Sequence, residues 1–309
     1  MFDVFGLGHC CIDHLSILEP YPEKGKKGVV VESCLTGGGP VPTALRLVTR
    51  FGGTATFCGK VGDDDAGRQI ISELRDDNID TRQLVVDPQT TTARADIWID
   101  PADGRRTIAL KIPANPWISA DQIDVELVTN CRIFFTDGRE REASIKGLRS
   151  AREAGITTVF DTGSSRPGLY DMLPLIDYAI VSQDLFEHIE SEEMSLRKGS
   201  DMQVDRSRKL ADHLIKAGAK AVIVTLGERG ALWHDGTQIR ILVGFPVKAI
   251  DTTGAGDVFH GAFIHGLLQN WEVSSIIEFA NAAAAASCRR LSGSGGIPTL
   301  EEVGVLIEG

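Results

Sequence analysis

The sequence predicts an α/β fold in which a mostly parallel sheet is covered by helices on both faces, with a second, smaller β-sheet beside it. After Pro116, short apolar runs alternate with segments of helical spacing, as expected for parallel strands joined by helices. Before Pro116, two pairs of alternating, partly polar stretches interrupt a strand, helix, strand unit. The length, 309 residues, suits one large core with a small addition.

The first part of the chain supplies the start of the main sheet and the whole of the small one. Buried strands are predicted at 2–8 and 54–61, with a helix from Thr43 to about Phe51 between them. The strands of the small sheet are predicted at 12–19, 28–35, 93–99 and 105–112. We therefore expect a single domain, residues 1–309, with a lid from about 12–36 and 92–113 inserted into the α/β core.

The remainder of the chain repeats strand and helix. Strands are predicted at 131–136, 156–161, 177–182 and 220–226. Helices are predicted at about 139–154, 184–190, 203–217 and 272–288. Ligands of open parallel sheets bind outside the carboxyl ends of the strands. The polar or glycine positions at those ends are Asp137, Arg139, Asp161, Ser182, Thr225 and Gly227.

Composition and charge exclude several classes of protein. A net charge of −11 and a pI near 5.1 argue against binding to nucleic acid, which needs a basic face. No run approaches the roughly 18 apolar residues of a membrane-spanning helix. The N-terminus also lacks the basic segment of a signal peptide, so we expect a cytoplasmic protein with no membrane partner. The six cysteines include no Cys-x-x-Cys pair and are expected to be buried, reduced thiols.

The most informative segment runs from Asp251 to Asp257 and reads Asp-Thr-Thr-Gly-Ala-Gly-Asp, just before an apolar helix. The backbone N–H groups of Gly254, Ala255 and Gly256 would be unpaired at a helix N-terminus, where they can bind an anion. Asp257 in the first turn could accept the proton of an alcohol that attacks a bound phosphoryl group. The alternative is an ordinary helix start capped by Thr252 or Thr253.

This segment resembles the C-terminal signature of the PfkB, or ribokinase-like, carbohydrate kinases, Asp-Thr-x-Gly-Ala-Gly-Asp, and matches it completely. The resemblance implies that Asp257 is the catalytic base and that the amides of Gly254, Ala255 and Gly256 form the anion hole. It also implies ATP and Mg²⁺, a sugar substrate, a ribokinase-like three-layer core with a β-sheet lid, and a homodimer formed through the lids. In some relatives a monovalent cation such as K⁺ lies at the positions of Asp251 and Thr253.

A second segment, Thr225-Leu-Gly-Glu-Arg-Gly230, follows a predicted strand and places a hydroxyl and glycine backbone where a nucleotide could lie. A plain turn with Gly230 at positive φ explains the same residues. The family carries a similar Thr-Leu-Gly-x-x-Gly at its nucleotide site, which favours nucleotide contacts by Thr225, Gly227 and Gly230. By the same resemblance, Ser182, Asn281 and the loop from Ser292 to Pro298 are expected near the nucleotide.

The glycines Gly37, Gly38 and Gly39 precede a predicted helix and could contact a ligand or serve as a hinge. In the family this loop contacts sugar hydroxyls, and an aspartate at the position of Asp13 binds two of them. The resemblance therefore assigns Asp13, Gly38, Gly39 and Thr43 to the sugar. Asp63 or Asp64 is predicted to cap a helix instead.

Because of two departures from ribokinase proper, the sequence does not identify the sugar that accepts the phosphoryl group. The family's Asn after the glycine loop aligns with Pro42, and its Asn-x-x-Glu motif aligns with Ser182-Gln-Asp-Leu185, where Glu187 is a substitute that could reach magnesium through water. Other segments resemble the ketohexokinase and sulfofructose-kinase side of the family. Arg139, with Lys111 and with Lys26 or Lys27, could bind an anionic sugar, although scattered surface charge explains these residues too.

The expected function is ATP-dependent phosphorylation of a sugar hydroxyl, with a ketose or an anionic derivative such as sulfofructose as acceptor. The alternatives are a kinase acting on ribose or a nucleoside, and a non-catalytic sugar- or nucleotide-binding protein that kept the fold. A nicotinamide-dependent oxidoreductase is disfavoured because Cys11 stands where its third glycine belongs. The chain also has no Gly-x-x-x-x-Gly-Lys-Ser/Thr loop and no His-Glu-x-x-His spacing.

Overall fold

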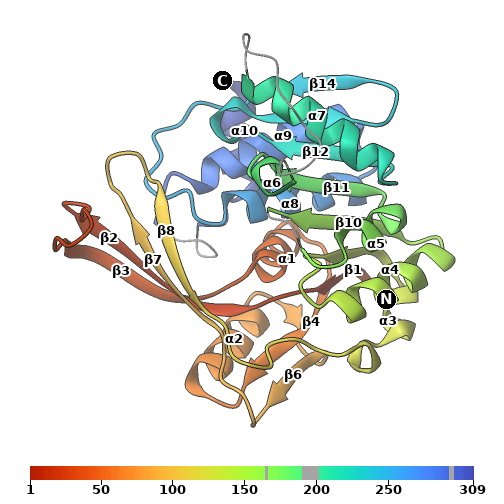
Figure 1. Cartoon of the computed structure of the whole chain (residues 1–309), viewed down its shortest axis with the longest axis horizontal. Coiled ribbons are helices and arrows are strands. Elements are labelled where there is room, and N and C mark those ends of the chain that lie inside the picture. The colour runs from red at the N-terminus through yellow and green to blue at the C-terminus, as the bar shows by residue number, and fades with distance from the viewer. Residues whose placement is uncertain (164–165, 190–201, 292–295) are drawn as a thin grey trace.

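The computed structural model describes residues 1–163, 166–189, 202–291 and 296–309, and within them the strands form two sheets (Figure 1). The main sheet has the order β14-β13-β12-β11-β10-β9-β1-β4-β5, and β6 pairs with β4. Its strands are β1 (Phe2–Leu7), β4 (Ala55–Gly62), β5 (Ile79–Asp80), β6 (Leu84–Asp87), β9 (Cys131–Thr136), β10 (Thr157–Thr162), β11 (Tyr178–Ser182), β12 (Ala221–Thr225), β13 (Ala231–His234) and β14 (Ile239–Leu242). From β5 to β12 all neighbours are parallel, which confirms the predicted mostly parallel sheet.

Helices cover both faces of this sheet and give two hydrophobic cores. Their bounds are α1 (Pro40–Arg50), α2 (Asp65–Asp76), α3 (Val125–Thr129), α4 (Arg141–Glu153), α5 (Leu169–Met172), α6 (Leu185–Ile189), α7 (Met202–Lys216), α8 (Ala255–Leu268), α9 (Val273–Ser287) and α10 (Leu300–Glu308). Short 3₁₀ turns lie at Ala120–Gln122, Leu173–Leu175 and Gly227–Arg229. Because strand side chains alternate, Ile133 and Phe135 of β9 pack with α1, α8 and α9, whereas Phe134 packs with α4 on the other face. The predicted three-layer arrangement is confirmed.

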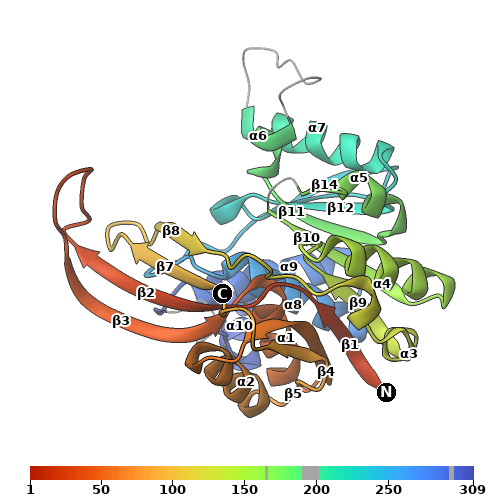
Figure 2. The same ribbon diagram turned by 60° about the horizontal axis from the view of Figure 1, so that its bottom comes forward.

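The small sheet consists of β2 (Cys11–Glu19), β3 (Val29–Gly38), β7 (Arg94–Ile99) and β8 (Arg106–Lys111), in the order β3-β2-β7-β8. β2 and β3 form an antiparallel hairpin, and β7 joins β2 in parallel. Figure 2 shows the sheet reaching out from the side of the main body. The predicted second sheet is therefore present, with strand ends within a few residues of those expected.

Charged groups of α1 and α2 hold the base of the small sheet. Arg46 of α1 donates to the carbonyl oxygen of Gly37 at 3.1 Å and to Glu73 of α2 at 3.0 Å. Glu73 also accepts from the backbone N–H of Gly37 and from the hydroxyl of Thr36. Arg46 is only 4% exposed and Glu73 is 27% exposed, and this partly buried pair anchors the glycine segment to the core.

Several boundaries differ from the sequence prediction for physical reasons. The first helix begins at Pro40 rather than Thr43, because proline is well suited to the first helical turn. Asp64 caps α2 as predicted, by accepting from the N–H of Gly67 at 2.9 Å. The antiparallel strands β13 and β14 were not predicted. Residue 190 of the predicted helix 184–190, and residues 292–295 of the predicted adenine loop, lie outside the described residues. In the part of the chain that the structure describes, no helix is long and apolar enough to cross a membrane.

Candidate active site

The carboxyl ends of the parallel strands meet at one edge of the main sheet, and the small sheet begins there. β1 leads through His9 directly into β2. Asp137 follows β9, and Asp161 lies near the end of β10. Ser182 and Thr225 end β11 and β12 and are direct register partners. The polar residues that the sequence placed at strand ends therefore share one edge, where a ligand of this type of sheet binds.

The segment Asp251–Asp257 contains the start of α8, which has no side-chain cap among the described residues. Gly254 is the N-cap of α8, has a left-handed φ of 73°, and no side chain accepts from the first turn. The capping alternative for Thr252 and Thr253 is wrong because tertiary contacts engage this segment. The hydroxyl of Thr252 donates to Gly104 at 2.9 Å and accepts from Arg106 at 3.2 Å. A Cβ on Gly256 would have no atom of the described residues within 4 Å, so none of them covers the helix start at this position.

Asp257 lies in the first turn of α8 among other ionisable groups. Burial raises its pKa well above the ordinary value, and the charge of Asp161 adds to the rise while Arg106 opposes it. One ligand atom each of Asp161, Asp257 and His260 lies within 4.8 Å of the others. The cluster is compact enough to surround a cation, but Oδ1 of Asp161 is 3.3 Å from Nε2 of His260, which is within the distance of an ion pair.

Asp13 of β2 lies opposite the glycine segment of β3. Its side chain is 7% exposed, and a Cβ on Gly38 would lie 1.8 Å from Oδ2 of Asp13. The thiol of Cys11 donates to Oδ1 of Asp13 at 3.0 Å. Burial raises the pKa of Asp13 to about 6. Asp13 also raises the pKa of Asp257, so the two carboxylates are close enough to feel each other's charge.

The other two predicted residues of the glycine segment have mainly structural contacts. Gly39 is the N-cap of α1 at φ 112°, where a Cβ would lie 2.3 Å from the carbonyl oxygen of His9. Thr43 is 2% exposed, and its N–H donates to the carbonyl oxygen of Gly39 at 3.1 Å. Glycine is therefore required at position 39 by the close passage of the chain between β1 and β2.

A buried cluster of charged groups lies behind Asp13. Asp137 accepts from the N–H groups of His9 and Arg139, both at 3.0 Å. Burial raises the pKa of Glu140 well above its ordinary value, and burial lowers the pKa of Arg166. In this cluster, the buried atoms that have no hydrogen-bond partner within the described residues are His9 Nε2, Arg139 Nε, Arg166 Nε and both carboxyl oxygens of Glu140. Such unsatisfied polar atoms at one place indicate a site that a polar ligand completes.

The predicted nucleotide residues lie at the ends of β11 and β12, in the turn after β12, and in the middle of α9. Gly227 is exposed at φ 62°, and a Cβ there would have no atom of the described residues within 4 Å, whereas a Cβ on Gly230 would lie 2.1 Å from the carbonyl oxygen of Leu242. Gly230 thus has the positive φ that the turn alternative predicted. Thr225 donates from its hydroxyl to Val181 at 3.3 Å. Asn281 is buried, and its amide donates to the carbonyl oxygens of Leu242 and Val243, both at 3.2 Å.

The candidate cation residues lie on either side of this edge. Glu187 is exposed on α6, five residues after β11 ends. Asp251 is buried and accepts from the N–H of Thr253 at 2.8 Å. The hydroxyl of Thr253 is buried and has no hydrogen-bond partner within the described residues. The Thr253 hydroxyl oxygen is therefore a candidate ligand for a cation beside the start of α8.

Lys111 does not join this site, which corrects its prediction as a substrate residue. Lys111 of β8 pairs with Arg94, which pairs with Ile12, and strand side chains alternate between faces. It therefore lies on the face opposite Asp13. Arg106, five residues earlier, pairs with Ile99 on the face of Asp13 and donates to Thr252. Counting alternate residues along 105–112 would have found Arg106 instead.

His260 and Arg166 were also not selected from the sequence. His260 follows Asp257 by three residues, and this spacing puts both on one face of a helix. That signal was available. Arg166 lies in the loop after β10 and has no spacing pattern, so only the folded chain brings it beside Arg139.

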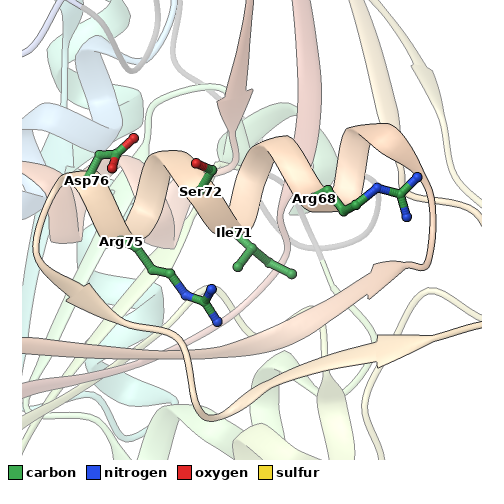
Figure 3. Close-up of a pocket in the computed structure, with 5 residues that line it drawn as sticks. All are labelled: Arg68, Ile71, Ser72, Arg75 and Asp76. Atoms are coloured by element: carbon green, nitrogen blue, oxygen red, sulfur yellow. The ribbon is translucent and has the colours of Figure 1, made fainter.

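A shallow hollow of about 360 Å³ on α2 lies outside this site (Figure 3). It is lined by Arg68, Ile71, Ser72, Arg75 and Asp76. Arg68 already pairs with Asp63 and Asp65, and Arg75 donates to Thr81. Its cationic groups are thus engaged on the protein surface.

Comparison with known proteins agrees with the fold. The family model described as pfkB family carbohydrate kinase matches residues 1–300. Fructokinase-1 of Zea mays is 29% identical over 294 residues, which cover 88% of both chains. Ribokinase of Staphylococcus aureus (strain COL) is 27% identical and covers 96% of this chain and 97% of its own. A crystal structure of ribokinase from Thermotoga maritima covers 100% of both chains with a TM-score of 0.80 at 24% identity, a likeness of fold. The chain therefore belongs to the pfkB family of carbohydrate kinases and is a sugar kinase.

Proposed function

We propose that this kinase transfers the γ-phosphoryl group of ATP to a hydroxyl of a sugar, with Asp257 as the base. The sugar oxygen forms the new bond to phosphorus, the bond to the β-phosphate oxygen breaks, and the hydroxyl proton passes to the Asp257 carboxylate. The supporting observation is the uncapped start of α8, where amides and a carboxylate share one turn beside Asp13. The amides of Gly254, Ala255 and Gly256 would stabilise the negative charge of the migrating group.

The nucleotide would lie along the ends of β11 and β12. Gly227 leaves its backbone accessible, Thr225 offers a hydroxyl, and Ser182 lies beside it in register. Gly230 and Asn281 would act indirectly, because their contacts shape the loop after β14. Mg²⁺, when bound to ATP, neutralises charge on the β- and γ-phosphates, and Glu187 could reach it through water.

A monovalent cation such as K⁺ is proposed at Asp251 and Thr253. The buried Thr253 hydroxyl without a partner among the described residues supports it, since a cation accepts such an oxygen ligand. Its position beside Gly254 would let it steady the start of α8.

The acceptor is proposed to be a sugar with an anionic substituent. Burial and the charge of Asp13 raise the pKa of the Cys11 thiol, and Arg139 is close enough for its charge to oppose this rise, so Arg139 lies near Asp13. Arg166 adds a second guanidinium, and burial favours the neutral form of Glu140. Two guanidiniums at one place favour a sulfonate, carboxylate or phosphate as the substituent of the sugar. A ketose of the ketohexokinase and sulfofructose-kinase side of the family fits this proposal, with Asp13, Gly38, Gly39 and Thr43 around its hydroxyls.

The small sheet is proposed to act as a lid and as the contact between two subunits. It carries Asp13 while the main body carries Asp257, so closing it would bring sugar to the base. It exposes apolar side chains, which favours a partner surface. These are Val29, Val30, Val31, Leu35, Trp98, Ile108 and Leu110. Sedimentation of the native chain beside a Val29→Lys, Val31→Lys variant tests the homodimer, which the variant should dissociate.

The decisive assay measures ADP release from Mg²⁺-ATP with a panel of acceptors. The panel contains fructose, sulfofructose, phosphosugars, ribose and nucleosides. We expect turnover that depends on the sugar, prefers an anionic ketose and is lost in Asp257→Asn. Thermal stabilisation by sugars without any ADP release would instead support a non-catalytic binding protein, the alternative that the missing Asn-x-x-Glu motif favours. Turnover with ribose or nucleosides alone would contradict the ketose proposal.

A further inference from the structure

His260 of α8 is enclosed by hydrogen-bond acceptors. Its Nδ1 is 2.6 Å from the carbonyl oxygen of Gly256, one turn earlier. Its Nε2 is 3.3 Å from the carbonyl oxygen of Ile180 and 3.3 Å from Oδ1 of Asp161. The ring is 5% exposed and stacks on Phe135 with centroids 5.8 Å apart. Water therefore has little access to either nitrogen.

The number of hydrogens on the ring decides whether these contacts are favourable. A neutral imidazole has one N–H and one lone pair, so one nitrogen would face acceptors without a hydrogen. Both nitrogens donate only in the imidazolium form, whose positive charge then lies against Asp161. The pair is therefore best satisfied as an ion pair in which both ring nitrogens carry hydrogen.

Asp257 lies against this pair, with one atom each of Asp161, Asp257 and His260 within 4.8 Å of the others. The other charged groups that act on Asp257 come from separate elements: Arg106 of β8 is cationic, and Asp13 of β2 and Asp137 after β9 are anionic. Without a charge on His260, Asp161 and Asp257 would be two neighbouring carboxylates, and one would tend to hold a proton. A protonated Asp257 cannot accept the proton of the sugar.

We propose that Asp161 and His260 are a positioning pair for Asp257, in which the imidazolium of His260 keeps the base ionised and Asp161 holds the imidazolium in place. This rests on the proposed role of Asp257. The pair touches neither sugar nor nucleotide in this account. It acts through the charge state of Asp257 and so affects phosphoryl transfer rather than the binding of substrates.

The first experiment reads the ring directly. The ¹⁵N shifts of the His260 imidazole in the full-length protein at pH 7 should show both nitrogens protonated. A ring with one unprotonated nitrogen would overturn the proposal. One divalent metal ion per chain in the purified wild type, absent from His260→Asn, would also overturn it, because a metal would then supply the positive charge.

The second experiment measures the single-turnover rate of sugar phosphorylation against pH. The acid limb of the profile should move to higher pH by about one unit or more in His260→Asn, since one compensating charge near a carboxylate is lost. Adding Asp161→Asn should move it back toward the wild-type position, because a single carboxylate then remains. Dissociation constants for sugar and ATP should stay within about threefold of wild type. An unmoved acid limb in a folded His260→Asn protein would contradict the pairing.

The matched control is His265→Asn, on the same helix and also 5% exposed, but among Phe51, Trp271 and Phe279. It should lower stability without moving the acid limb. Full activity in Asp257→Asn would remove the proposed base itself, a failure separate from that of the pair. If His260→Asn does not fold, the imidazole shifts of the wild type still decide the question.

Discussion

Gly38 leaves the space that the carboxylate of Asp13 occupies. A Cβ at position 38 would lie 1.8 Å from Oδ2 and 2.4 Å from Cγ of Asp13, far inside van der Waals contact. The two residues lie on neighbouring strands, β3 and β2, and the backbone of β3 thereby fixes where the carboxylate can lie. A backbone glycine and a proposed sugar-binding group thus form one unit.

Gly38→Ala should displace Asp13 and lower kcat/KM for the sugar by about 100-fold, because a displacement of about 1 Å at a positioned group has an effect of that size. The free energy of unfolding should fall by roughly 1–3 kcal/mol from overpacking. Steady-state kinetics and urea unfolding measure the two effects. Gly304→Ala in α10, where a Cβ meets no atom within 4 Å, is the control and should stabilise slightly without loss of activity.

Asp257→Asn should reduce turnover by roughly 10²–10⁴-fold or more, since it removes the proposed general base. It should also raise the melting temperature. The folded pKa of Asp257 is raised by burial and by Asp161, so its charge destabilises the native protein at neutral pH and an amide removes that cost. A melting temperature lower than that of wild type at pH 7.5 would argue against this electrostatic account.

Asp13 should make sugar binding depend on pH. Its pKa is raised by burial from 3.8 to about 6, so the carboxylate becomes ionised between about pH 5 and 7. An ionised acceptor binds hydroxyls more strongly, and sugar affinity should rise roughly tenfold across this range. Calorimetry in the Asp257→Asn background isolates the effect from the base, and an added Asp13→Asn change should abolish the pH dependence.

The raised pKa of Asp13 affects folding in the opposite direction from sugar binding: the free energy of unfolding should fall as the pH rises. Because the folded pKa of Asp13 lies above its unfolded value, the native state binds this proton more tightly. The contribution of Asp13 to the free energy of unfolding is therefore greatest below about pH 4 and declines as the pH rises to about 6. Asp13→Asn should flatten the stability curve in that window, as followed by urea unfolding at several pH values.

Arg139→Ala and Arg166→Ala should weaken anionic acceptors by about 10–100-fold in kcat/KM and change neutral acceptors little, because a hydrogen bond to a charged group contributes about 1.5–3 kcal/mol. Arg139→Lys should recover only part of the loss, since lysine lacks the planar pair of donors. Lys111→Ala is a matched control, a basic residue on the opposite face of the small sheet. Equal losses with anionic and neutral sugars would indicate a structural role for the arginines.

Thiol reactivity should follow burial. Burial raises the pKa of Cys58 to about 12 and of Cys131 to about 11, which leaves little thiolate at pH 8. Cys34 alone of the six cysteines is partly exposed. An aromatic disulfide reagent should therefore label Cys34 first in the native protein and all six after denaturation. Fast labelling that survives Cys34→Ala would contradict this assignment.

The sequence alone was sufficient for most of the fold because the buried strands carry strong patterns. The run 131–136 predicted β9 with its bounds unchanged. The pair β13 and β14 was missed although Asp235 and Gly236 form a turn between them, since four-residue strands carry too little alternation. The proposed cap at Thr252 failed because Gly104 and Arg106, distant in sequence, compete for its hydroxyl.

The candidate site was less accessible from the sequence. A local motif predicted roles for Asp257 and Gly254, and the family resemblance predicted one for Asp13; the structure then supplied the surroundings of all three. Arg166, Glu140 and the contact between Asp161 and His260 depend on which strand ends become neighbours, and no local spacing encodes that. Lys111 and Arg106 stand at odd and even positions along β8, so their side chains point to opposite faces of the small sheet, and an error of one residue in the predicted register exchanges the two faces.

The strand order of the main sheet implies that the proposed active site is completed late, while the chain is being synthesised. β1 is an interior strand that pairs with β4 and with β9, and α1 packs against α8, which begins only at Ala255. The small sheet can close once residue 111 has been made, whereas Asp257 enters the chain almost 150 residues later. Nascent chains that end before α8 would already contain Asp13, the proposed sugar-binding carboxylate, but their apolar core would still lack α8. Chaperone binding or aggregation would compete with folding while the nascent chain is at this length.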